Sequence, residues 1–360
     1  MSKRFFFDID WGLLAPIMIL IILSLTTLFS INLSLFRSQL LFSLIGLFAF
    51  FFFSKTNYKT ISLYSIPIYV FSIISLLLVL IIGIESRGSL RWFEIFGFRF
   101  QFSEVLKPFL AISFSSYLAS KENYSLKTFF LVLTLLFPIF FLVFLQPDLG
   151  NALVYFIVVV FTLMVFGFPV RYFAGMIFLA LISLPILFRF ILHDYQKERI
   201  FTFLNPADSL GASYNVIQSV IAVGSGMFFG RGLGQGTQSG LRFLPERHTD
   251  FIFATISEGL GFVGAIIVIF AFALLLYRIF LIASFQENLF PKTFAITVFF
   301  LIIIQFVVNI GMNIGIFPIV GITLPFVSYG GSSLLSSFIL IGLLSAISKK
   351  TYLRDEMEIR

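Results

Sequence analysis

The sequence contains no cysteine and only two histidines, His193 and His248, among 360 residues. The lack of cysteine excludes disulfides, thiolate metal sites and cysteine nucleophiles, and two histidines are too few for a histidine-built metal centre. Charged residues are also few: they make up 11% of the chain, and hydrophobic residues make up 59%. This balance is far from that of a soluble domain. We therefore expect an integral membrane protein whose chemistry depends on carboxylates, hydroxyls and basic side chains.

Apolar runs long enough to cross a bilayer follow one another along the whole chain. They lie near residues 12–31, 38–53, 63–84, 105–119, 128–145, 149–166, 171–190, 251–276, 293–316 and 328–347. No small-residue cleavage pattern follows the first run, so we interpret it as a helix that is retained. The sequence thus predicts an all-α polytopic membrane protein of about ten transmembrane helices, forming a single domain over residues 1–360.

Positive charge is unevenly distributed between the loops. An even number of spans places both termini on one side of the membrane, and most basic residues near the span ends fall on that side. They are Lys3, Arg4, Lys55, Lys59, Lys121, Lys127, Arg171, Arg278, Lys292, Lys349, Lys350, Arg354 and Arg360. The positive-inside rule makes this side cytoplasmic. We therefore expect a protein of the cytoplasmic membrane with a large extracytoplasmic loop, residues 191–250, between the seventh and eighth helices.

Two segments on the predicted outer side, 85–104 and 191–250, contain further cations. These are Arg87, Arg91, Arg99, Lys197, Arg199, Arg231, Arg242 and Arg247. Each alone is explained as solvated charge in a long loop, which the orientation rule tolerates. Together they indicate an outward-facing site for an anion.

The large loop is rich in glycine between residues 224 and 236. It has neither the P-loop spacing nor a dinucleotide-binding turn between a strand and a helix, so a nucleotide site is excluded. We expect these glycines to allow sharp turns or close packing of the backbone on membrane helices.

Charged residues also occur where the fourth span begins. Phenylalanines at every second position from Phe96 to Phe102 predict a short extended piece. Glu104 and Lys107 follow, three residues apart and therefore on one face of a helix, where both a structural ion pair and a functional site are open. Ser103 is also explained as a helix cap. Asp148, in the turn "LQPDLG", is explained by capping too, but it lies on the same predicted side of the membrane.

Two carboxylates mark the eighth span. Asp250 lies at its mouth, and Glu258 lies eight residues further, about 80° around the helix axis. A helix-terminal charge accounts for Asp250 and would stabilise the helix by about 0.3–1 kcal/mol. An acidic group inside a span costs several kcal/mol unless it is paired or hydrated. Glu258 therefore predicts a polar cavity that opens outward.

Several long blocks of the sequence resemble the SEDS family (shape, elongation, division and sporulation), and its RodA branch in particular. In chain order they are "SEVLK", "LQPDLG", "SYNVIQSVIAVGSG", "GLGQGTQSGLRFLPERHTDFIFATISEGLGFVG" and "VNIGMNIGIFPIVGITLPFVSYGGSSLL". The resemblance covers essentially the whole chain. Two positions depart from the family pattern: Phe102 replaces a common proline, and Gly259 replaces a frequent acidic residue.

The resemblance implies a peptidoglycan glycosyltransferase that polymerises lipid II on the outer face of the cytoplasmic membrane during elongation. It implies that Asp250 is the catalytic base, activating the 4-hydroxyl of the acceptor's N-acetylglucosamine. This hydroxyl attacks C1 of the donor's N-acetylmuramic acid with inversion and expels undecaprenyl diphosphate. Glu104, Lys107 and Asp148 match polar residues of the family's central cavity. We assign the diphosphate to Lys107 and Arg91 because cations suit phosphate oxygens.

Further residues near these blocks complete the predicted substrate-binding set. They are Ser103, His248, Thr249, Glu258, Ser328 and Ser332. The "SYGGS" segment that contains the last two is explained equally well as a tight turn opening the final helix. The sequence offers no metal-ligand set and leaves open whether a divalent cation, Mg²⁺ or Mn²⁺, assists the diphosphate.

Three other functions remain open. A lipid II flippase or transporter fits a polar cavity among glycine-rich helices, although no inverted repeat is visible. A division polymerase like FtsW and an inactive scaffold that activates a penicillin-binding protein are the others. The resemblance implies as partners lipid II as donor and acceptor, a class B penicillin-binding protein, elongation-complex proteins and membrane lipid. Nucleic acid is not expected.

Overall fold

The computed structural model describes residues 10–86, 89–95, 98–121, 123–192, 194–204 and 213–358. Several residues named above lie outside this part of the chain: Lys3, Arg4, Arg87, Phe96, His193 and Arg360. Over the described residues the regular secondary structure is helical apart from one small sheet.

Every predicted span corresponds to a helix, in the expected order. These helices are α2 (Trp11–Ile31), α3 (Leu33–Phe53), α5 (Ser65–Ile82), α7 (Lys107–Ala119), α8 (Leu126–Leu145), α9 (Leu149–Val165), α10 (Val170–Ile186), α14 (Ile252–Ser284), α15 (Leu289–Asn313) and α16 (Gly331–Glu358). Within the described residues, 8 helices are long and apolar enough to cross a membrane. The two remaining predicted spans are the shorter helices α7 and α9. The predicted helical membrane fold is confirmed.

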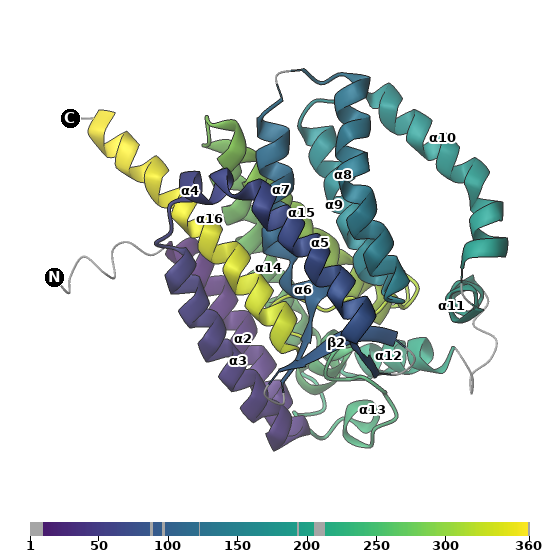
Figure 1. Ribbon diagram of the computed structural model, residues 1–360. Helices are drawn as coiled ribbons and strands as arrows, with labels where there is room; N and C mark the ends of the chain where they lie inside the picture. The colour runs from purple at the N-terminus through teal and green to yellow at the C-terminus, as the bar shows by residue number, and fades with distance from the viewer. Residues whose placement is uncertain are drawn as a thin grey trace.

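Short elements fill the connections between the long helices. They are α4 (Tyr58–Leu63), α6 (Phe102–Val105), the π-helix η1 (Leu187–Ile191), α11 (Asp194–Leu204), α12 (Tyr214–Ser225) and α13 (Thr237–Gly240). Figure 1 shows α12, α13 and the sheet at one end of the helical bundle, and the C-terminal end of α16 at the opposite end. The segments that contain the predicted outward cations therefore gather at one end of the molecule.

A three-stranded antiparallel sheet is the β-structure found in the described residues. It comprises β1 (Ile84–Ser86), β2 (Ser89–Ile95) and β3 (Phe98–Gln101), in that order. Trp92 pairs with Gln101 and Phe93 with Phe100. The extended piece predicted from the alternating phenylalanines is confirmed, but it forms a hairpin. Phe102 leaves the strand and begins α6, where its ring meets the Phe93 ring at 5.9 Å between centroids.

The bundle is closed by contacts between the two ends of the chain. Helix α16 packs along α3 (Figure 1), and its Phe338 ring fills the space beside Gly46, where an added Cβ would lie 2.1 Å from the ring. Helix α10 stands apart from the bundle in Figure 1, and large apolar side chains such as Phe178 and Leu179 are exposed on it. Such a surface suits contact with lipid rather than with water.

Helix α14 is broken at Gly261. A straight helix of its 33 residues would rise about 50 Å, against a bilayer core of about 30 Å. Gly261 has a φ of +68°, a conformation that favours glycine. The break leaves backbone groups without helical partners, and in a lipid environment such groups must be satisfied by other parts of the protein.

The large loop supplies these missing partners. The amides of Phe262 and Val263 donate to the carbonyls of Met227 at 2.8 Å and Phe228 at 3.2 Å. In return, the amides of Arg231 and Gly232 donate to the carbonyls of Glu258 at 2.9 Å and Gly259 at 3.0 Å. A Cβ at Gly230 would lie 2.2 Å from the Gly259 carbonyl oxygen. The close packing predicted for the loop glycines is therefore confirmed, and loop and helix form one unit.

Candidate functional site

The predicted site residues meet around a non-helical stretch between α15 and α16, residues 314–330, called here the connecting segment. Helices α2 and α3 hold it from one side. The Ser24 hydroxyl donates to the Val327 carbonyl at 2.6 Å, and the Gln39 amide donates to the Ser328 carbonyl at 3.1 Å. A buried segment outside regular structure needs such partners for its backbone.

Asp250 lies directly before α14 and faces the connecting segment. Its backbone carbonyl accepts hydrogen bonds from the side-chain amides of Asn313 at 2.9 Å and Asn309 at 3.2 Å. Its carboxylate is directed toward Gly321, where an added Cβ would lie 3.7 Å from Oδ2. Gly321 has a φ of +72°. Asp250 as a whole is half-buried, and the two asparagine amides fix its backbone.

Sequence reasoning missed Asn309 and Asn313 as part of this site. Both are fully buried on α15, and Asn313 also accepts a hydrogen bond from the Ala254 amide at 3.0 Å. A signal was present, because the two residues are four apart and therefore on one face of an apolar helix. Polar side chains inside a span need hydrogen-bond partners, and the partners of these two asparagines lie in the turn that contains Asp250.

His248, Thr249 and Ser328 lie beside Asp250 and fasten its turn to the connecting segment. The Ser328 hydroxyl donates to the Thr249 carbonyl at 2.7 Å. The Tyr329 amide donates to the His248 carbonyl at 2.8 Å, and the two rings lie 5.6 Å apart. These contacts hold the turn that contains Asp250 against the connecting segment. Their predicted contact with substrate remains a prediction.

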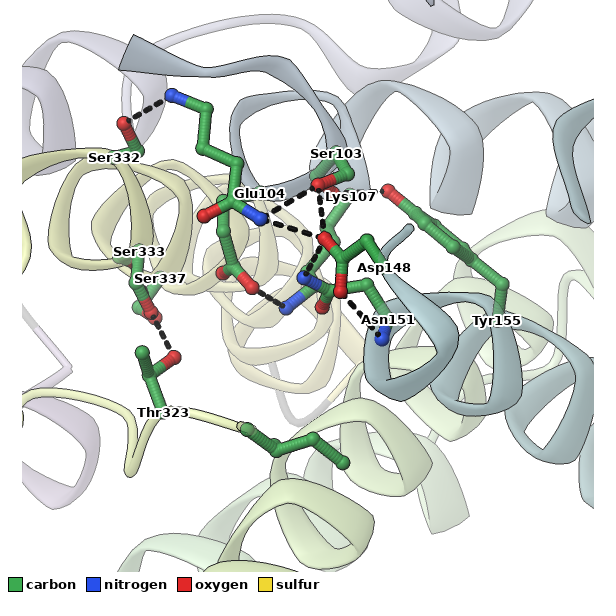
Figure 2. Close-up of polar contacts among 12 residues, drawn as sticks. Ser103, Glu104, Lys107, Asp148, Asn151, Tyr155, Thr323, Ser332, Ser333 and Ser337 are labelled. Carbon is green, nitrogen blue, oxygen red and sulfur yellow. Dashed lines mark hydrogen bonds and ion pairs between the residues drawn. The ribbon is translucent and has the colours of Figure 1, made fainter. Parts of the chain in front are cut away.

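A second polar cluster forms where the hairpin meets α6 and α9 (Figure 2). Oδ2 of Asp148 accepts hydrogen bonds from Gln101 Nε2 at 2.6 Å, Asn151 Nδ2 at 2.9 Å and Ser103 Oγ at 3.0 Å. Oδ1 accepts from the Asn151 backbone amide at 3.2 Å, so the predicted capping of the next helix is confirmed. Asp148 is only 3% exposed, and the hydrogen bonds from these donors stabilise its charge.

Ser332 extends this cluster to α16, and Tyr155 adds a further contact from α9. The Gln101 backbone amide donates to the Ser332 hydroxyl at 2.9 Å, which joins β3 to the start of α16. The Tyr155 hydroxyl on α9 donates to the Ser103 carbonyl at 2.7 Å. Figure 2 shows these side chains converging from separate elements.

Glu104 and Lys107 form the ion pair that their spacing predicts. Lys107 Nζ lies 2.7 Å from Glu104 Oε1, and the side chains are 2% and 5% exposed. In the amide orientation that satisfies both of its atoms, Gln305 accepts from Lys107 Nζ at 2.8 Å. Oε2 of Glu104 is buried without a hydrogen-bond partner among the described residues. The ammonium of Lys107 thus faces protein groups, and its contact with a diphosphate remains a prediction.

Glu258 and Arg91 lie outside both clusters. Glu258 is fully buried, and its carboxylate accepts hydrogen bonds from the backbone amides of Gln238 and Ser239, each at 2.8 Å. The prediction of an outward cavity around Glu258 is therefore wrong. Backbone amides of the large loop occupy this place and stabilise the carboxylate by hydrogen bonds. Arg91 lies half-buried on β2.

The two clusters adjoin neighbouring residues of the connecting segment. A Cβ at Gly150, two residues after Asp148, would lie 2.4 Å from the Val320 carbonyl oxygen. The next residue, Gly321, lies against the Asp250 carboxylate. The structure thus brings Asp148 and Asp250, about a hundred residues apart, to the same short stretch of chain.

Comparison with known proteins identifies the family of this chain. The profile of the cell cycle protein family FtsW/RodA/SpoVE matches residues 4–353. The chain belongs to this family. The predicted SEDS membership is confirmed. The peptidoglycan glycosyltransferase MrdB of Escherichia coli K12 is 39% identical over 282 residues, which cover 78% of this chain and 76% of MrdB.

Solved structures of similar proteins share the fold. One comes from work on the structural coordination of polymerization and crosslinking by a peptidoglycan synthase complex. It has a TM-score of 0.84 and 31% identity, and the match covers 96% of this chain and 98% of that one. The rod shape determining protein RodA of Thermus thermophilus has a TM-score of 0.72 and 27% identity, with the same coverage. The family fold thus extends over nearly all of this chain.

Among the residues that the structure describes, no three His, Asp or Glu side chains come together. This part of the chain therefore contains no metal site built from protein side chains alone. Mg²⁺ is often held by one or two carboxylates together with substrate phosphates. A Mg²⁺ or Mn²⁺ ion at the diphosphate therefore remains a prediction that depends on the substrate's own oxygens.

Asp148→Asn is expected to loosen the hairpin from α9. The substituted amide keeps one acceptor but places an NH₂ group against donors, which leaves buried polar groups unpaired at a cost of about 1–3 kcal/mol each. Thermal unfolding of the purified protein should show a lower melting temperature. Asp194→Asn, at an exposed carboxylate on α11, is the matched control and should have no effect. Equal melting temperatures for both variants would contradict this role of Asp148.

Proposed function

We propose that this protein is a peptidoglycan glycosyltransferase that polymerises lipid II on the outer face of the cytoplasmic membrane, with Asp250 as general base. The observation that supports this most is the presentation of Asp250. Its backbone is fixed by two buried asparagines, while its carboxylate faces a glycine. The relative MrdB is named a peptidoglycan glycosyltransferase, and the proposal extends that activity to this chain.

In the proposed reaction, the Asp250 carboxylate takes the proton from the 4-hydroxyl of the acceptor's N-acetylglucosamine. The oxygen attacks C1 of the donor's N-acetylmuramic acid from the face opposite the leaving group, so the configuration inverts. The bond between C1 and the diphosphate oxygen breaks, and its electron pair leaves with undecaprenyl diphosphate. The energy is stored in the donor itself, which suits an outward site without access to nucleotides.

We further propose a role in cell elongation alongside a class B penicillin-binding protein and other elongation proteins. The block "RFLPERHTDF" supports elongation over division, although the family includes both branches. The similar synthase-complex structure, whose description joins polymerization with crosslinking, supports a transpeptidase partner.

Polymerisation of lipid II by the purified full-length protein tests the proposal. The assay is run with and without the cognate transpeptidase, and glycan strands are separated by size. Strands in the wild-type reaction support the polymerase. If no strands form even with the partner, while lipid II crosses liposome membranes containing the protein, a transporter replaces the proposed enzyme.

A further inference from the structure

A small cavity lies between the outer end of α2 and the large loop, on a different set of residues from those around Asp250. Its volume is 70 Å³, several times the about 10–15 Å³ that one water needs. Its lining comes from Ser30 and Ile31 on α2, loop residues 233–234 and 239–240, Arg247, and Thr255 on α14. Figure 1 shows α13, which contains two of these residues, at the end of the molecule where α2 ends. The cavity is therefore at the level where a membrane span finishes.

The lining carries an uncompensated positive charge. Arg247 donates a hydrogen bond to the Ser239 carbonyl, and no carboxylate lies within ion-pair distance of it among the described residues. The buried Glu258 carboxylate accepts the Ser239 amide at 2.8 Å and forms no ion pair with the guanidinium. Burial first, and then the charge of Arg242, lowers the pKa of Arg247 from its ordinary value. Both causes disfavour the charged form, so an anion bound beside the guanidinium would stabilise it.

Apolar side chains are exposed on the elements that form the cavity. Leu241 and Phe243 flank Arg242 directly after the lining residue Gly240, and Phe29 directly precedes the lining residue Ser30. Exposed apolar side chains beside cations are typical of a surface that lies at the lipid headgroups, where the side chains enter the acyl region and the cations remain at the phosphates.

We propose that this cavity binds a lipid-borne phosphate group, with the Arg247 guanidinium as its charged ligand. Guanidinium suits this role because its fork of N–H donors matches phosphate oxygens. Ser30 and Thr255 also line the cavity, but their hydroxyls donate to the carbonyls of Thr27 and Arg247, so the guanidinium is the donor left for the phosphate. Two kinds of lipid could supply this phosphate. One is the diphosphate of a polyprenyl-linked sugar, and this source rests on the proposed function. The other is the phosphodiester of an ordinary membrane phospholipid, which does not.

Native mass spectrometry of the full-length protein, released from detergent, tests this inference. Undecaprenyl diphosphate and phosphatidylglycerol are added separately, and the lipid-bound fraction is measured over a range of lipid concentrations. Arg247→Gln should weaken binding of at least one of the two lipids about tenfold or more, the effect of losing a charge-assisted hydrogen bond. Ser30→Leu, which fills the cavity without changing charge, should weaken binding of the same lipid. Arg231→Gln, an equal charge change at an exposed arginine of the same loop, should not.

The pattern of loss separates the two sources. Loss of undecaprenyl diphosphate alone assigns the cavity to the substrate lipid, and loss of phosphatidylglycerol alone assigns it to the bilayer. Unchanged binding of both lipids by Arg247→Gln overturns the inference, as does an equal loss in Arg231→Gln, which would reflect general surface charge. Because polymerisation is not measured, failure of the proposed enzyme activity and failure of this site give different results.

Discussion

Asp250→Asn is expected to abolish glycan polymerisation and to leave the fold intact. The amide is nearly the same size as the carboxylate but cannot take a proton from the acceptor hydroxyl. General base catalysis contributes about 10²–10⁴-fold to rate, so activity should fall by at least that range. The backbone carbonyl of residue 250 keeps its bonds from Asn309 and Asn313, so the turn remains in place. Strand formation from lipid II, measured with the transpeptidase present, checks the result.

Two controls make this result specific. Asp194→Asn removes an exposed carboxylate from the same loop and should polymerise at the wild-type rate. Binding of the transpeptidase and the melting temperature should be equal in the wild type and in Asp250→Asn. If Asp250→Asn forms strands as fast as the wild type, the base must be sought elsewhere.

Lys107→Met is expected to lower the free energy of unfolding by about 3–5 kcal/mol, the cost of leaving one buried charge without its partner. The remaining Glu104 carboxylate would be almost fully buried, and one of its oxygens already has no hydrogen-bond partner among the described residues. Unfolding of the purified protein in mixed micelles, followed by tryptophan fluorescence or circular dichroism, measures the change.

The double variant Glu104→Gln with Lys107→Met should recover much of this loss, because it removes both charges together. Lys197→Met breaks a pair with the same spacing whose partner Asp194 is fully exposed, so little change is expected. If Lys107→Met alone proves as stable as the wild type, the pair is not the structural element inferred here. If the double variant is stable but does not polymerise, the pair also has a role in substrate binding.

The parts of this structure that the sequence predicted are those that depend on nearby residues. Each transmembrane helix follows from its own apolar run, and the pairing of Glu104 with Lys107 follows from a spacing of three on one helix. The capping of α9 by Asp148 follows from a local turn pattern in the same way. Asp250 was predicted as a site residue because the sequence block that contains it resembles a family. This resemblance is a stronger signal than the position of Asp250 at the end of a helix.

The parts that escaped prediction join distant segments through the backbone. Glu258 indicated a polar cavity because nothing in its own helix explains it, but its partners are two amides about twenty residues earlier. A backbone amide is present at nearly every residue and therefore leaves no pattern in a sequence. The break of α14 at Gly261 was missed for the same reason, since its compensating bonds come from the backbone of residues 227–232.

The connecting segment also determines when this protein becomes complete during its synthesis. Ser24 and Gln39 bond to residues that leave the ribosome 303 and 289 positions later. The first helices must therefore wait in the bilayer while nearly the whole chain is translated, with the buried Gln39 amide lacking its final acceptor. A nascent chain that stops before residue 321 already contains Asp250, Asn309 and Asn313, but not Gly321, which the Asp250 carboxylate faces. Activity is thus expected to begin only after the connecting segment has been made and has packed against α2 and α3.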